Sequence, residues 1–140
     1  MINKMDKTSV IRKEHFNSAH RLNNPNWTKE KNLSFYGKCN NPNFHGHNYD
    51  LEVTVTGYTD EESGYLIDMK VLSDTIKSEI LDRYDHKNLN LDVDDFKALN
   101  PTAENISKVI YNRLRNKLDS KFELKIKLYE TERNIVVYPG

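Results

Sequence analysis

With 140 residues, the chain fits one domain, 1–140, that is large enough to bury a core of its own. Charged residues make up 30% of the sequence and balance at 21 basic against 21 acidic, so no overall field favours nucleic acid or a membrane surface as partner. The single cysteine excludes an intrachain disulfide, and no apolar run reaches membrane-span or signal-peptide character, which predicts a cytoplasmic protein.

The N-terminal half predicts two strands joined by a long loop. Residues 8–20 mix β-branched and polar residues in a strand-like way. Residues 23–48 are turn-rich and lack clear periodicity, and a structureless loop of that length inside a compact domain is usually functional. Residues 47–56 alternate between apolar and polar types, with one face formed by Tyr49, Leu51, Val53 and Val55. That alternation is typical of a half-buried antiparallel strand.

The C-terminal half predicts two helices followed by two strands. Asp68 can cap a helix that ends near Tyr84 and has apolar positions at Met69, Leu72, Ile76 and Ile80. Thr102 can cap a second helix with an apolar stripe at Ile106, Val109, Ile110, Leu114 and Leu118. Residues 121–130 and 134–139 predict the closing strands. This order predicts an α+β fold, a four-stranded antiparallel sheet with two helices on one face.

Three histidines form a candidate zinc site. His45 and His47 project to the same side of a strand that begins at or just before them, because strand side chains repeat every two residues. Pairing of the first two strands would bring His20 to them. Three histidines with one open position are the coordination of a catalytic zinc. Taken alone, however, a His-x-His is more often two unrelated surface or turn histidines.

Cys39 lies six positions before His45 among polar and cationic neighbours. A lone cysteine is commonly a small buried apolar residue, but a nearby ammonium or zinc ion would favour the reactive thiolate. Asp85 and His86 place a carboxylate beside an imidazole after the first predicted helix. Neighbouring residues rarely face each other, so the pair need not form a dyad within one chain, and a helix C-terminal histidine is the simpler interpretation.

Glu130 falls in phase with the apolar face of the strand that starts at Phe122. Burying a carboxylate there without a partner would cost roughly several kcal/mol of folding free energy. It therefore lies either in water at a frayed strand end or opposite a ligand that donates two parallel N–H groups.

Together these segments resemble the 6-pyruvoyl-tetrahydropterin synthase / 6-carboxy-tetrahydropterin synthase family over about residues 10–138. The resemblance is carried by FNSAHRL at 16–22, GKCNNPNFHGHNY at 37–49, DHKNLNLDV at 85–93, PTAEN at 101–105 and YETERNIVVY at 129–138. It implies zinc bound by His20, His45 and His47, with Cys39 as the catalytic base. It further implies a proton relay through Asp85 and His86, and a pterin held by Glu130 in a pocket lined by Thr102 and Glu104.

The same resemblance implies the tunnelling fold (T-fold), in which the sheets of several subunits join into a barrel. The expected assembly is a homo-hexamer, a dimer of trimers, with pockets between subunits. The implied activity is that of a lyase of tetrahydrobiopterin biosynthesis, which converts the small-molecule substrate 7,8-dihydroneopterin triphosphate to 6-pyruvoyl-tetrahydropterin with elimination of triphosphate. No nicotinamide cofactor is required, and the sequence has no Gly-rich dinucleotide fingerprint.

Three alternatives remain open from the sequence. The nearest is 6-carboxy-5,6,7,8-tetrahydropterin synthase of queuosine biosynthesis, a carbon–carbon lyase that releases acetaldehyde. The five residues between Cys39 and His45 resemble the pyruvoyl-forming enzymes more, since carboxy-forming relatives more often have a shorter gap. A cupin-like metal oxygenase is disfavoured because Glu52 has opposite strand parity to His47. A pterin- or zinc-binding module without turnover is the non-enzymatic alternative.

Overall fold

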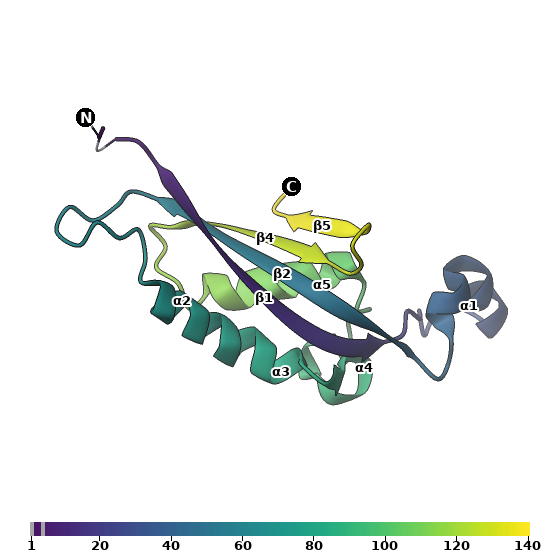
Figure 1. Cartoon of the computed structure of the whole chain (residues 1–140). Helices are drawn as coiled ribbons and strands as arrows, with labels where there is room; N and C mark the ends of the chain where they lie inside the picture. The colour runs from purple at the N-terminus through teal and green to yellow at the C-terminus, as the bar shows by residue number, and fades with distance from the viewer. Residues whose placement is uncertain (1, 4) are drawn as a thin grey trace.

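The computed structural model describes residues 2–3 and 5–140 and has two layers, a sheet and a set of helices that cover one of its faces (Figure 1). The strands are β1 (Thr8–His20), β2 (His45–Gly57), β3 (Lys87–Asn88), β4 (Glu123–Tyr129) and β5 (Ile135–Tyr138), in the sheet order β3-β1-β2-β4-β5. The predicted α+β class and the four antiparallel strands are confirmed. The predicted strand number is wrong, because β3 adds a fifth strand parallel to β1.

Two helical segments pack under the sheet. The first runs from α2 (Met69–Ile76) through a wide π-helical turn, η2 (Lys77–Leu81), into α3 (Asp82–Tyr84), and the second is α5 (Ala103–Arg115). Both predicted caps are present, since Asp68 Oδ1 accepts from the Lys70 amide at 2.8 Å and Thr102 Oγ1 from the Asn105 amide at 3.1 Å. The buried positions of the first segment recur every fourth residue, at Leu72, Ile76, Ile80 and Tyr84.

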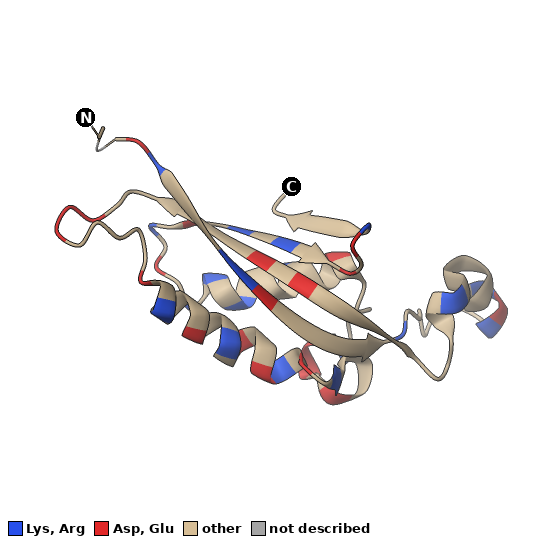
Figure 2. Cartoon of the chain, in the orientation of Figure 1, with Lys and Arg blue, Asp and Glu red and all other residues tan. Residues whose placement is uncertain are grey.

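The core lies between these helices and one face of the sheet. Strand alternation sends every second side chain of β1, β2 and β4 toward the helices, and the fully buried members include Phe16, Tyr49, Leu51, Val53, Ile126 and Leu128. The opposite face of the sheet carries charge, with acidic positions of β2 beside basic positions of β4, as Figure 2 shows. The sheet therefore has one apolar face and one polar face.

A helix, α1 (Lys29–Tyr36), followed by the 3₁₀ turn η1 (Gly37–Asn40), occupies the segment predicted as a structureless loop. The prediction of a structureless loop is therefore wrong. The sequence does not reveal this helix because α1 has no apolar stripe. Thr28 caps it, and the buried Asn32 side chain donates to the carbonyls of Asn24 at 2.8 Å and Thr28 at 3.1 Å. Trp27 also packs on α1, with ring centroids 5.2 Å from Phe35 and 5.9 Å from Tyr36. Neither kind of contact leaves a helical apolar periodicity in the sequence.

The remaining helices are short and surround the end of the sheet where β1 finishes. They are α4 (Leu89–Asp92) and the 3₁₀ turn η3 (Asp94–Phe96), both between β3 and α5. None of the helices in the described part of the chain combines the length and apolar character that a membrane crossing requires.

A polar network ties η3 to the helices. Asp95 accepts from the Tyr84 hydroxyl at 2.9 Å and from Arg113 Nε at 2.8 Å, and only 16% of its side chain is exposed. Burial opposes the ionised form, but the hydrogen bonds from Arg113 and Tyr84 outweigh it, so the pKa of Asp95 lies below its ordinary value. The carboxylate is therefore more stable in the folded chain than in the unfolded chain.

We expect Asp95→Asn to lower the free energy of unfolding by about 2 kcal/mol at pH 7, the typical loss of a hydrogen bond to a charged group. Because the folded pKa is depressed, this contribution is present above the unfolded pKa near 4, roughly, and is lost as the pH falls through the folded value. Urea denaturation of the wild type and the variant at several pH values measures the difference in the free energy of unfolding. Asp94→Asn, at a side chain that is 88% exposed, is the matched control and should not change stability; equal stability of both variants would contradict the prediction.

Candidate active site and metal centre

The three predicted histidine ligands meet where β1 ends and β2 begins. The antiparallel register pairs His20 with His45, and strand parity places His47 on the same face. The ring centroids of His20 lie 4.6 Å from His45 and 5.0 Å from His47. One ligand nitrogen of each histidine lies within 4.8 Å of the others. The structure therefore brings together the predicted metal-binding triad.

His20 is oriented by groups behind it. Its Nδ1 lies 2.8 Å from the Pro101 carbonyl oxygen, which requires that Nδ1 carries the proton and leaves the Nε2 lone pair free. The Tyr49 hydroxyl lies 3.5 Å from the same Nδ1. His20 Nε2 and His45 Nδ1 are both buried and have no hydrogen-bond partner in the described part of the chain. Buried nitrogens without a partner are rare, and a bound cation would satisfy both.

The charge state of the triad suits a metal. Burial lowers the pKa of His20 to about 4, with the Pro101 hydrogen bond opposing the shift and His45 and His47 adding to it. Burial, followed by the nearby His47, also lowers the pKa of His45. These two rings are therefore neutral at pH 7 and present lone pairs rather than protons. Three imidazole nitrogens are a donor set that zinc accepts, so the residues present fit the ion.

Cys39 lies on η1, half-buried, and its backbone is fixed beside the end of β1. The Cys39 carbonyl accepts from the Leu22 amide at 2.9 Å, two residues beyond His20. The next residue, Asn40, has a buried side chain that donates to the Leu22 carbonyl at 2.8 Å. The group of side chains that could hold a metal ion contains the three histidines and not Cys39. The thiol is thus held on the segment next to the triad without belonging to it.

Glu130, Thr102 and Glu104 line one pocket of about 680 Å³. Its other walls are mainly apolar or aromatic and include Leu22, Phe35, Tyr36, Ile135 and Val136. Burial and the negative charge of Glu130 raise the pKa of Tyr49, whose ring packs against His47 with centroids 5.5 Å apart. Glu130 therefore acts electrostatically on a residue that contacts the triad, and Thr102 of this pocket directly follows Pro101, whose carbonyl contacts His20. The Thr102 hydroxyl also serves as the cap of α5.

Asp85 and His86 contact each other but belong neither to the histidine triad nor to the lining of the Glu130 pocket. His86 Nδ1 is 3.0 Å from Asp85 Oδ2, and the Asn17 amide of β1 donates to Asp85 Oδ1 at 2.8 Å. Neighbouring residues rarely face each other, but these two side chains are in contact, and His86 has a left-handed backbone with φ of 60°. The His86 side chain is 84% exposed, and neither residue lines the pocket of Glu130. The Asn17 hydrogen bond, opposed by burial and supported by His86, lowers the pKa of Asp85.

Comparison with known proteins identifies the family. The model of the 6-pyruvoyl tetrahydropterin synthase family matches residues 9–140. The chain belongs to this family. A relative from Homo sapiens named 6-pyruvoyl tetrahydrobiopterin synthase is 40% identical over 96% of the chain and 92% of its own length. The solved structure of Caenorhabditis elegans 6-pyruvoyl tetrahydropterin synthase superposes with a TM-score of 0.91 at 35% identity, covering 99% of each chain.

A relative named for the carboxy-forming activity is less similar to this member of the synthase family than the relatives named for pyruvoyl formation. A Rickettsia typhi relative named 6-carboxy-5,6,7,8-tetrahydropterin synthase is 29% identical over 89% of the chain and 95% of its own length. Identity to the pyruvoyl-named relative is thus higher over comparable coverage.

Two supporting groups of the site were not predicted from the sequence. Tyr49 was assigned only to the apolar face of β2, although a hydroxyl two residues beyond His47 on the same face is a signal for a contact with the triad. The Pro101 carbonyl that orients His20 has no side-chain signature, since 81 residues separate the two. Only the fold reveals that contact.

Proposed function

We propose that this chain is a zinc-dependent lyase that converts 7,8-dihydroneopterin triphosphate to 6-pyruvoyl-tetrahydropterin with elimination of triphosphate. The observation that supports it most is the histidine triad, with two unpartnered nitrogens, beside a pocket that contains a half-buried carboxylate. Family membership and the names of the relatives agree with this activity.

Each residue of the site receives a role in this proposal. His20, His45 and His47 would hold the zinc ion, which supplies Lewis-acid polarisation of the substrate's side-chain oxygens. Glu130 accepts two parallel N–H groups from the aminopyrimidine edge of the pterin, and Thr102 and Glu104 complete that pocket. Cys39, as thiolate, removes a proton from a carbon of the substrate's side chain.

Asp85 orients His86, which returns or relays protons as the side chain of the substrate rearranges. The exposed position of this pair at the edge of β1 supports a site shared between subunits, because the pair lies outside the pocket of its own chain. A homo-hexamer built as a dimer of trimers would supply such a site. The short β3 and the four-residue β5 end the sheet and are available for pairing with neighbouring subunits.

One measurement separates the candidate activities. The zinc-loaded protein is incubated with 7,8-dihydroneopterin triphosphate under reducing conditions, and the products are identified by mass. We expect 6-pyruvoyl-tetrahydropterin and free triphosphate in equal amounts. A 6-carboxy product with acetaldehyde would instead favour the carboxy-forming alternative, and unchanged substrate would contradict both.

Glu130→Gln tests the pterin anchor. The amide keeps the size of the side chain but replaces a charged double acceptor, so we expect pterin affinity to fall by about 10- to 100-fold, equivalent to losing a hydrogen bond to a charged group. Fluorescence titration with 7,8-dihydroneopterin measures the change. Glu132→Gln removes the same charge at an exposed position two residues away and should bind normally. Equal affinity of the two variants would exclude Glu130 as the anchor.

A further inference from the structure

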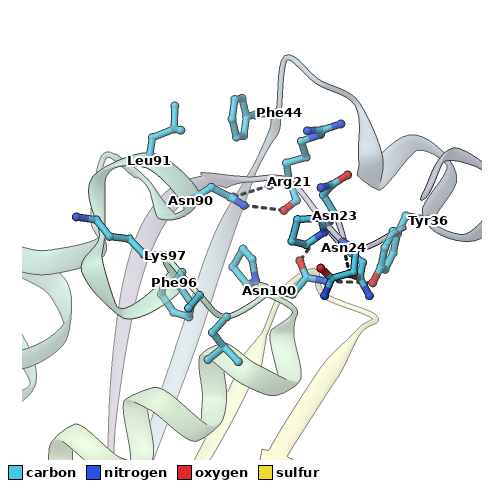
Figure 3. Close-up of a pocket in the computed structure, with 15 residues that line it drawn as sticks. Arg21, Asn23, Asn24, Tyr36, Phe44, Asn90, Leu91, Phe96, Lys97 and Asn100 are labelled. Carbon is cyan, nitrogen blue, oxygen red and sulfur yellow. Dashed lines mark hydrogen bonds between the residues drawn. The ribbon is translucent and has the colours of Figure 1, made fainter. Parts of the chain in front are cut away.

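A second pocket, of about 600 Å³, adjoins the Glu130 pocket at Tyr36, which lines both. It is enclosed by three segments, residues 21–26 after β1, α4, and residues 96–101 before α5 (Figure 3). Asn100 Nδ2 donates to the Tyr36 hydroxyl at 3.1 Å, and Asn90 bonds the Arg21 backbone on both sides, at 2.8 Å and 2.9 Å. The walls are therefore fixed by hydrogen bonds between distant segments.

The two pockets differ in charge. The second pocket is lined by two cations, Arg21 and Lys97, and five asparagines, and none of the described residues that line it carries a carboxylate. The Glu130 pocket instead contains two carboxylates and one cation, Arg133. In a chain with equal numbers of acidic and basic residues, this difference favours an anion in the second pocket and a cationic or N–H-rich group in the first.

Several donors of the second pocket are available to a ligand. Arg21 uses Nε to bind the Asn40 carbonyl at 2.9 Å, and its two terminal nitrogens have no partner in the described part of the chain. Asn24 Oδ1 accepts from the Asn26 backbone amide at 2.9 Å. Asn23 Oδ1 accepts from Asn40 Nδ2 at 3.0 Å. No hydrogen bond within the described residues involves either Nδ2. A fixed guanidinium with neutral amide donors suits the oxygens of a phosphate chain.

The pocket also adjoins the metal centre. Phe44, which precedes His45, and Pro101, whose carbonyl orients His20, both line it. The triad is thus flanked by the carboxylate-bearing pocket at Thr102, which follows Pro101, and by the anion-favouring pocket at Phe44 and Pro101. We infer that the second pocket binds the triphosphate tail of the substrate, with Arg21 as the charged contact and Asn23 and Asn24 as neutral donors. This inference rests on the proposed function, and it assigns the residues that hold the tail.

Asn24→Asp is the sharpest test, because aspartate is nearly isosteric and keeps the acceptor for the Asn26 amide while adding a negative charge to the pocket. We expect inorganic tripolyphosphate to bind the zinc-loaded wild-type chain in calorimetry and to bind this variant at least about 10-fold more weakly. Arg21→Gln, a second variant, should weaken binding to a similar extent. In both, KM for 7,8-dihydroneopterin triphosphate should rise by about 10-fold with kcat nearly unchanged.

Two measurements make the result specific to the tail. The affinity for 7,8-dihydroneopterin, which lacks phosphate, should be unchanged in both variants, and Lys108→Gln, at an exposed position of α5, should behave as wild type. Tripolyphosphate affinity and KM that are unaffected in both variants would overturn the inference while leaving the proposed activity standing. A wild-type chain that binds tripolyphosphate in this pocket but turns over no substrate would instead contradict the proposed function.

Discussion

Cys39→Ala is expected to abolish turnover of 7,8-dihydroneopterin triphosphate, with kcat lower by at least about 100-fold, while metal and pterin binding are retained. General-base catalysis contributes about 10²- to 10⁴-fold, and alanine provides no group that can take a proton. Retained binding is expected because the thiol is not in the group of histidines that could hold a metal ion and does not line the Glu130 pocket. Stopped-flow or end-point product analysis at saturating substrate measures the loss.

The control for this variant is a measurement of its folding and its metal content. The contacts that hold η1 are made by the Cys39 backbone carbonyl and by Asn40, so removal of Sγ should leave the melting temperature and zinc content unchanged. Turnover within about 10-fold of wild type would exclude Cys39 as the base, since even the weakest general-base effect exceeds that difference. Lost zinc would show instead that the thiol supports the metal centre.

His45→Ala is expected to lower metal affinity by more than about 100-fold and turnover with it. Loss of a partner that merely orients a ligand costs about 10- to 100-fold in metal affinity, and removal of a ligand costs more. His45 is the preferred position because its buried Nδ1 has no partner in the described part of the chain, so the ring makes no hydrogen bond through that nitrogen. Competition with a zinc-selective chelator measures the affinity, and elemental analysis measures the bound metal.

His15→Ala is the matched control for the metal prediction. His15 lies on β1 but on the opposite, exposed face, where its Nδ1 is 3.2 Å from Asp50 Oδ1. Removing that imidazole should leave zinc content and turnover unchanged. If both variants retain zinc at wild-type affinity, the triad does not bind the metal, and the basis of the proposed activity fails with it.

The features predicted correctly from the sequence are those that local patterns determine. The long strands and the two packed helices follow from alternation, spacings of three and four, and the caps at Asp68 and Thr102. The triad follows from parity within β2 and from hairpin-like pairing of β1 with β2, which the register of His20 and His45 confirms.

The features that were missed depend on contacts between distant segments. β3 is only two residues long and exists because the backbone of residues 87–88 reaches the edge of β1. The helix α1 is held by the hydrogen bonds of Asn32 and by ring contacts with Trp27, which precedes the helix, rather than by a periodic apolar face. The pocket with Arg21 and the asparagines joins segments more than 60 residues apart in sequence, as the 69-residue separation of Arg21 and Asn90 illustrates. No periodicity or spacing encodes such a surface.

The wide turn at Lys77–Leu81 determines which way the end of the first helical segment points. In a regular α-helix, positions four residues apart advance by about 40°, so a buried stripe at every fourth residue would wind away from the sheet. The π-helical turn takes up this excess rotation, and Tyr84 still packs against Phe16 with ring centroids 5.8 Å apart. The rotation of the helical segment about its axis is thereby set so that the Asp85 carboxylate can accept from the Asn17 amide. The extra residue of this turn is what keeps a four-residue spacing in phase with the sheet, and deleting it would restore a regular α-helix in which Tyr84 and Asp85 still face β1.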